Sequence, residues 1–418
     1  MKKKKLFKPV DIKALRKLLR SLSHPSKTQK TQLRNTALVT AAVVLVVGVF
    51  AVSPTLQNYF QSQPSEAGLL TPDSPDDDSK AHLKIGPEMK IEVGLSSFPE
   101  LADAYEDYLL FCANHYPGGV FQRDLFLYNT KTHAPAIPLT NDVGDECVNW
   151  SKGKKAAIYG NNIVYVSSTS VLHTYSIYNA LDKTIDIYDD KGSPLYVIGL
   201  DLSRDQAVLS LMLDPFHAAQ PAQLWLYRIS DNHLTQIYDE WFRQDYPAIY
   251  KNSYIWKDWR DIYNGNTNIY VRKVGSEVEK QIKGSLFGTN DHGDIWGNKI
   301  VWTNLQSGTD DPVIYLHDLI SGSTKTVASD LADYQMRPLT AGNRFVLFDN
   351  GDNATQTVDI YLYDNKYDKS YNLTSDDATV VGNNKKTWWL SNNILYVYYT
   401  KYINGERDIY TRRIYINP

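Results

Sequence analysis

Asp359-Ile360-Tyr361-Leu362-Tyr363-Asp364 is the stretch that decides the fold, because close relatives of it recur from residue 124 onward. Each copy has the branched and aromatic composition of a short β-strand. The other copies are Asp124–Tyr128, Ile185–Asp189, Leu224–Tyr227, Asn268–Val271, Val313–Leu316 and Asp408–Tyr410. Their central residues lie 61, 39, 44, 45, 46 and 48 residues apart, which averages about the length of one four-stranded propeller blade. The chain is therefore a repeat protein.

The clearest repeat consists of four predicted strands, at 293–296, 299–303, 313–316 and 324–327. Turns at Gly297-Asn298 and Ser321-Gly322 separate them, and similar turn signals recur elsewhere. Dividing residues 90–418 by the repeat length predicts an all-β fold, a β-propeller of seven four-stranded antiparallel blades. Six blades is the alternative, with residues 172–199 as an insertion.

The last repeat supplies three strands, near 387–390, 394–400 and 408–416. Met89–Val93 has the alternation of a strand but no local partner. We expect it to complete the last blade and close the ring, because closure removes the two open sheet edges of a linear array.

Two segments resemble the TolB-like, or WD40-like, β-propeller repeat family. Leu139–Asp142 followed by Val148–Lys155 is similar to the family's signature for strand d, strand a and their turn. Gly293–Trp302 is similar to a variant found in cell-surface propellers. The resemblance covers residues 90–418 and implies the propeller fold. It does not imply one function, because members of the family serve as scaffolds, envelope translocation factors and non-catalytic parts of peptidases. Unlike TolB, the chain is expected to have no α/β domain before the propeller and to keep a membrane anchor.

Charge is divided unevenly along the chain, with about +11 in residues 1–35 and −14 in the remainder. Residues 36–52 are uncharged and apolar, and span roughly 26 Å as a helix. We predict an uncleaved transmembrane signal-anchor helix over residues 36–59; a cleaved signal peptide is the alternative. The cations before this segment place the N-terminus in the cytoplasm and the propeller outside the cell membrane.

The segments on either side of the predicted membrane helix are polar. Residues 1–35 read as a basic cytoplasmic tail, in which a short amphipathic helix follows Asp11 or the chain is disordered. Residues 60–89 are rich in proline and acidic residues, which is typical of a disordered stalk. The acidic outer part argues against nucleic-acid binding.

No catalytic or metal-binding motif is present: the sequence has no Gly-x-Ser-x-Gly, no His-x-x-x-His and no Cys-x-x-Cys. We therefore predict no metal site, no cofactor and no enzymatic activity. The alternative is an extracytoplasmic enzyme that processes glycans or peptides with carboxylates in d–a loops at the channel mouth. Those carboxylates are Asp142, Asp145, Glu146, Asp291 and Asp294.

Loops between strands b and c, and between d and a, share one face of a propeller. Here they contain aromatic and arginine residues, which dominate interface energetics. The candidate partner-binding residues are His115, Tyr116, Asp214, Phe216, His217, Trp241, Phe242, Arg243, Arg260 and Tyr263. We predict a membrane-anchored scaffold that binds an extracytoplasmic protein or cell-wall ligand.

Cys112 and Cys147 are the only cysteines, and we expect them on strand b of the first blade and strand a of the second. Outside the membrane an even count favours a disulfide. The alternative is two small buried hydrophobic side chains.

Overall fold

The residues that the computed structural model describes begin at Leu83. They are 83–94, 98–115, 122–140, 154–167, 170–189, 191–213, 221–238, 241–282, 288–305, 311–329, 331, 334–352, 357–374, 386–403 and 406–417. The predicted tail, the predicted membrane helix and residues 60–82 of the predicted stalk lie outside these ranges. Within them, no helix is long and apolar enough to cross a membrane.

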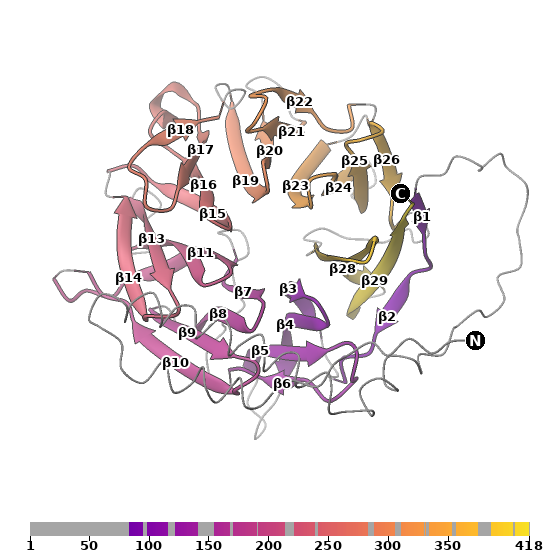
Figure 1. Cartoon of the computed structure of the whole chain (residues 1–418), viewed down its shortest axis with the longest axis horizontal. Coiled ribbons are helices and arrows are strands. Elements are labelled where there is room, and N and C mark those ends of the chain that lie inside the picture. The colour runs from indigo at the N-terminus through magenta and orange to yellow at the C-terminus, as the bar shows by residue number, and fades with distance from the viewer. Residues whose placement is uncertain are drawn as a thin grey trace, which may run out of the picture. The chain divides into compact units, whose positions relative to one another are not determined.

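The described strands form seven antiparallel sheets around a central axis (Figure 1). In chain order, blade 1 has β3 (Glu100–Tyr105), β4 (Tyr108–His115), β5 (Gln122–Asn129) and β6 (Ile137–Pro138), and blade 2 has β7 (Ala156–Tyr159), β8 (Asn162–Ser167), β9 (Val171–Ser176) and β10 (Leu181–Asp186). Blade 3 has β11 (Tyr196–Ser203), β12 (Gln206–Met212), β13 (Ala222–Arg228) and β14 (His233–Tyr238), and blade 4 has β15 (Gln244–Tyr250), β16 (Ser253–Asp258), β17 (Asn268–Lys273) and β18 (Glu279–Gln281).

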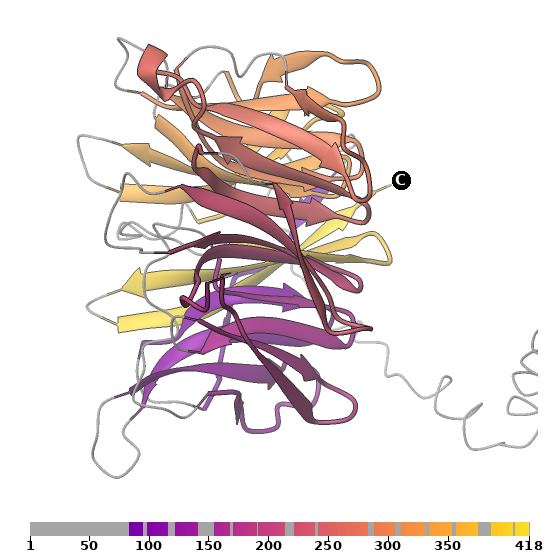
Figure 2. The ribbon, with the colours of Figure 1, turned by 90° about the vertical axis from the view of Figure 1, so that its left-hand side faces the viewer.

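Blade 5 has β19 (Thr289–Trp296), β20 (Lys299–Leu305), β21 (Val313–Asp318) and β22 (Thr324–Thr326), and blade 6 has β23 (Tyr334–Ala341), β24 (Phe345–Asp352), β25 (Thr357–Asp364) and β26 (Lys369–Asn372). Blade 7 has β27 (Lys386–Ser391), β28 (Ile394–Ile403) and β29 (Glu406–Ile416). The prediction of seven blades is confirmed. Seen from the side, the turns between neighbouring strands gather at the two faces of the ring (Figure 2).

The N-terminal end of the described chain closes blade 7. β2 (Met89–Ile91) pairs with residues 409–411 of β29, as the sequence predicts. β1 (Leu83–Ile85) also pairs with β29, at residues 414–416, although it lies in the segment predicted as stalk. The paired chain therefore begins at Leu83 rather than near residue 90.

The prediction that Ile185–Asp189 is the repeated third strand of blade 2 is wrong. The third strand of this blade is β9, whereas Ile185 and Asp186 end the outer strand β10. This displacement explains the irregular spacings of 61 and 39 residues on either side of Ile187. Residues 172–199 are strands of blades 2 and 3, so the six-bladed alternative is also wrong.

The apolar core of the described chain lies between blades. Each blade is covered on both faces by its neighbours, so its inner strands are apolar on both sides. Between blades 4 and 5, for example, Ile255 and Ile269 pack with Trp302. Between blades 7 and 1, Leu101 packs with Ile409, and this contact completes the ring.

The repeated Asp-containing strand and the Leu-Thr signature form one hydrogen-bonded motif. In blade 1, Thr140 donates to Asp124 (3.0 Å) and its hydroxyl accepts from the backbone N–H of Leu125. In blade 6, Thr374 donates to Asp359 (2.7 Å) in the same arrangement. The threonine hydroxyl thus joins the outer strand to the start of strand c.

Candidate functional site

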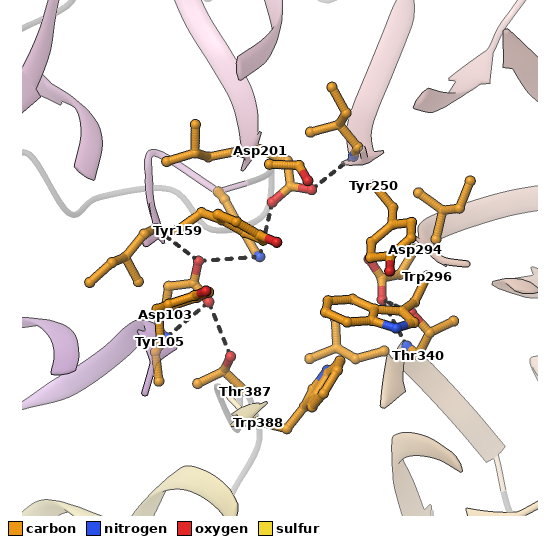
Figure 3. A pocket seen from close by; sticks show the side chains of 18 of the residues that line it. Asp103, Tyr105, Tyr159, Asp201, Tyr250, Asp294, Trp296, Thr340, Thr387 and Trp388 are labelled. Atoms are coloured by element: carbon orange, nitrogen blue, oxygen red, sulfur yellow. Dashed lines mark hydrogen bonds and ion pairs between the residues drawn. The ribbon is translucent and has the colours of Figure 1, made fainter. Parts of the chain in front are cut away.

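The innermost strands of the seven blades all run in the same direction, so their C-terminal ends meet at one end of the central channel. A pocket lies there, lined by residues at the ends of these strands and by Lys154, just before β7 (Figure 3). Its cavity volume is about 90 Å³, enough for several water molecules, since each needs about 10–15 Å³. The lining includes Asp103, Tyr105, Lys154, Tyr159, Asp201, Tyr250, Asp294, Trp296, Thr340, Thr387, Trp388 and Trp389.

The turn after each innermost strand fixes which side chains reach the pocket. Its first residue has a positive φ in all seven blades, and in blades 1, 3 and 5 this residue is Glu106, Arg204 and Gly297. An aspartate stands three residues before each of these, and side chains two residues apart on a strand share a face. Blades 1, 3 and 5 therefore present Asp103, Asp201 and Asp294 to the pocket. The residue just before the turn is aromatic in four blades and also lines the pocket; these residues are Tyr105, Tyr159, Tyr250 and Trp296.

Each of the three aspartates also binds the next blade. Asp103 accepts from the backbone N–H of Ile158 (3.2 Å), and Asp201 accepts from that of Ile249 (2.8 Å). Asp294 accepts from both the backbone N–H and the hydroxyl of Thr340, each at 2.7 Å. The carboxylates therefore satisfy backbone donors on the exposed edge of the neighbouring innermost strand.

Lys154 lies between two of these carboxylates, with its Nζ 3.3 Å from Asp201 and 3.8 Å from Asp103. Its side chain is 34% exposed, so it faces the pocket rather than the core. Burial lowers the pKa of Lys154, but the carboxylates of Asp103, Asp201 and Asp294 outweigh it and raise the pKa overall. Lys154 is therefore charged at neutral pH.

Asp294 has a different environment from the other two aspartates. Burial and the nearby charge of Asp201 raise the pKa of Asp294 to about 6, against the lowering effects of Lys154 and Thr340. Burial also raises the pKa of Asp103. Among the described residues, Lys and Arg side chains form no ion pair with Asp294, so it carries the least compensated charge of the three.

Six aromatic side chains form two arcs around the carboxylates. In one arc, the ring of Tyr105 lies 4.8 Å from Tyr159 and 4.4 Å from Trp389, between ring centres. In the other, Trp296 lies 4.4 Å from Tyr250 and 4.7 Å from Trp388. We call these six residues the aromatic rim. Such side chains offer flat apolar faces together with polar edges.

The predicted loop surface lies at the opposite face, because the d–a loops enter the innermost strands at their other ends. Trp241 and Tyr263 are each 91% exposed there. Arg243 pairs with Asp245 (2.7 Å), and Arg260 pairs with Asp258 and Glu279. Phe242 is half-buried. Four of the other predicted residues lie outside the described residues: Tyr116, Asp214, Phe216 and His217. The backbone of His115 is described, as the end of β4, but its side chain is not. Partner binding by this surface stays a prediction.

Of the five carboxylates in the alternative enzymatic hypothesis, the structure describes two, and they lie in different surroundings. Asp291 and Asp294 lie on the innermost strand β19 rather than in a d–a loop, and only Asp294 lines the pocket. Asp291 lies 3.4 Å from Lys257. Asp142, Asp145 and Glu146 lie outside the described residues.

Cys112 lies on strand b of blade 1, as predicted, and is disulfide-bonded. The other member of the predicted pair, Cys147, lies outside the described residues. In the part of the chain that is described, no group of three or more His, Cys, Asp or Glu residues could hold a metal ion.

Solved structures with the same fold include several enzymes. An oligogalacturonate lyase from Vibrio parahaemolyticus superposes with a TM-score of 0.56 at 14% identity, over 79% of this chain and 97% of the lyase. The β-propeller domain of the Trilobed protease from Pyrococcus furiosus superposes with a TM-score of 0.52 at 10% identity, over 76% and 94%. TolB from Acinetobacter baumannii also matches, with a TM-score of 0.39 at 13% identity, over 73% and 80%. No protein-family model and no curated protein matches the sequence.

The prediction that the chain is not an enzyme is wrong in its reasoning. The absence of a hydrolase domain and of a catalytic motif does not exclude catalysis, because the matched lyase is an enzyme and 97% of its chain is covered by this propeller. The propeller fold implied by the resemblance to TolB-like repeats is confirmed. By its fold the chain is a seven-bladed β-propeller, and at these identities the likeness extends to the fold alone.

Proposed function

We propose that the chain is a membrane-anchored, extracytoplasmic β-propeller that binds a saccharide of the cell envelope in its central pocket. The observation that carries this proposal is the aromatic rim above the carboxylates of Asp103, Asp201 and Asp294. A sugar ring has C–H groups on its faces and hydroxyls at its edge. The faces pack on aromatic rings, while the hydroxyls donate to carboxylates in charge-assisted hydrogen bonds.

Two further considerations support a saccharide. The pocket combines apolar rings with a few convergent polar groups, which is typical of small-ligand sites. The matched lyase is named for an oligosaccharide, oligogalacturonate. The location outside the membrane rests on the charge and apolar segments of the sequence.

The proposal is tested with the full chain in a detergent that has no sugar headgroup. We expect selected oligosaccharides on a glycan array to bind, and Trp296→Ala and Trp388→Ala to weaken their binding at least about tenfold, as loss of a buried aromatic anchor does. Isothermal titration calorimetry measures the affinities. Trp241→Ala is the matched control, since Trp241 is exposed on the opposite face.

Two results contradict the proposal. The first is an array on which no saccharide binds. The second is binding that Trp241→Ala abolishes and that the two pocket variants leave unchanged, because this places the ligand on the loop surface.

A second candidate function is cleavage of a bound glycan with Asp294 as general acid. The observation that favours it is the position of Asp294 in the pocket wall, together with its pKa, raised to about 6 and so near the pH at which a general acid works best. Shortened oligosaccharides in the binding mixtures, detected by mass spectrometry and lost in Asp294→Asn, test this candidate.

A further inference from the structure

The charges that line the central pocket do not balance. Asp103, Asp201 and Asp294 contribute three carboxylates, and among the lining residues that the structure describes Lys154 is the one cation. Lys154 contacts Asp103 and Asp201, so its charge compensates the side of the pocket that those two residues form. The excess negative charge is concentrated on the other side, at Asp294.

The aromatic rim is also arranged around Asp294. Tyr250, Trp296 and Trp388 form one continuous arc, and the close view places Asp294 between Tyr250 and Thr340 on that side of the pocket (Figure 3). Aromatic faces attract cations through the ring quadrupole, most strongly when the ring is tryptophan. A carboxylate beside three aromatic rings is the arrangement that recognises an ammonium group.

We infer that the side of the pocket formed by Asp294, Tyr250, Trp296 and Trp388 binds a cationic amino group of the ligand. This inference rests on the proposed saccharide binding and narrows it to saccharides that carry free amines. Lys154 keeps the other side suited to hydroxyl groups, because it neutralises part of the charge there. An ammonium on Asp294 holds that carboxylate ionised, so this inference and acid catalysis by Asp294 exclude each other.

The raised pKa of Asp294 agrees with this assignment. Its causes are burial and the charge of Asp201, and Lys154 only partly offsets them. A ligand cation supplies the compensation that the lining lacks. The same geometry disfavours an anionic sugar, because a uronate carboxylate would lie against carboxylates of the protein.

The test compares three tetrasaccharides with the full chain at pH 6.5 by isothermal titration calorimetry. They are the chitosan tetramer with free amines, its fully N-acetylated neutral counterpart and tetragalacturonate. We expect the free amine form to bind at least about tenfold more tightly than the neutral form, as a charge-assisted hydrogen bond implies, and the uronate to bind most weakly.

Asp294→Asn removes the charge and keeps the shape of the side chain. We expect it to abolish the preference for the amine while the neutral tetramer binds as before. Asp318→Asn, outside the pocket, is the matched control and keeps the preference. Equal affinity for the amine and neutral forms, or tighter binding of the uronate, overturns the inference and leaves saccharide binding intact. Failure of all three ligands, together with an empty glycan array, contradicts the proposed function itself.

Discussion

Single aspartates in the central pocket have two roles at once. Asp294 holds blade 6 through Thr340 and also lines the cavity, and Asp103 and Asp201 do the same for blades 2 and 4. Burying a carboxylate costs free energy, and the hydrogen bonds that it accepts from backbone N–H groups offset part of that cost. The pocket therefore keeps negative charge as a consequence of how its blades are joined.

The charge on Asp294 makes a prediction for stability. Because the folded chain raises its pKa from 3.8 to about 6, the folded state binds the proton more tightly than the unfolded state. The ionisation of Asp294 therefore lowers the free energy of unfolding of the protein as pH rises from about 4 to 6, by about 1–3 kcal/mol in total. We expect the melting temperature of Asp294→Asn, relative to wild type, to increase between pH 4 and pH 7, measured by calorimetry.

Asp318 provides the opposite case on the same fold. Hydrogen bonds from Lys299 and Asn298 outweigh burial and lower the pKa of Asp318 below its usual value. Its contribution is already complete above pH 4, so Asp318→Asn is expected to melt lower than wild type by a constant amount between pH 5 and pH 7. A constant difference for Asp294→Asn over pH 4 to 7 contradicts the assignment.

For single residues, the sequence predicts the repeated motifs better than it predicts the pocket. Asp359 and Thr374 belong to patterns that recur and are local. The pocket residues also recur, as Asp103-Ala104-Tyr105 and Asp294-Ile295-Trp296 before their turns. This recurrence is visible in the sequence, but its meaning depends on which strand is innermost, and the sequence alone places Asp294 in a loop rather than on β19.

Among the elements, the N-terminal strands depend on β29 for their hydrogen bonds. Between β1 and β2, Glu88 accepts from Lys401 (2.7 Å), and it also bonds to Tyr399. The Lys401 side chain is fully buried. One carboxylate therefore fastens the first described segment to blade 7.

Glu88→Gln is expected to destabilise the propeller, because it removes the negative charge that Glu88 places 2.7 Å from the buried ammonium of Lys401. Removing one partner of a buried pair typically costs about 3–5 kcal/mol. Chemical denaturation measures the loss. Glu92→Gln, an exposed glutamate four residues along, is the matched control and should unfold like wild type. Indistinguishable unfolding of the two variants would show that Glu88 does not fasten the ring.

The elements that the sequence mispredicts are those where tertiary structure overrides composition. β1 lies among prolines and acidic residues and has no signal apart from its pairing with β29. In blade 2, Ile185–Asp189 resembles the repeated strand more closely than β9 does. β9 nevertheless takes the third position because it pairs with β8 along its whole length.

For the molecule as a whole, repeat length determines blade number and therefore the ring. The fold could be predicted because each blade interface repeats the same kind of packing. The pocket could not, since it exists only when seven strands from distant parts of the chain converge. Function at this scale also depends on which side of the membrane the ring lies.

The predicted location can be measured in bacterial cells that produce the full chain. We expect the chain to stay with membranes after alkaline carbonate extraction, and protease added outside spheroplasts to digest the propeller. The reason is that cations precede the apolar segment and acidic residues follow it. An N-terminal tag that remains on the chain shows that the anchor is uncleaved; its loss favours the signal-peptide alternative.

Replacing Leu45 and Val46 with arginine supplies the control, because each charge at the centre of a membrane helix costs about 2.5–3.5 kcal/mol. This variant should leave the propeller inside the cell and protected from external protease. Protection of the wild-type propeller in intact spheroplasts would contradict the predicted orientation. It would also remove cell-envelope saccharides as ligands, since they would be on the other side of the membrane from the pocket.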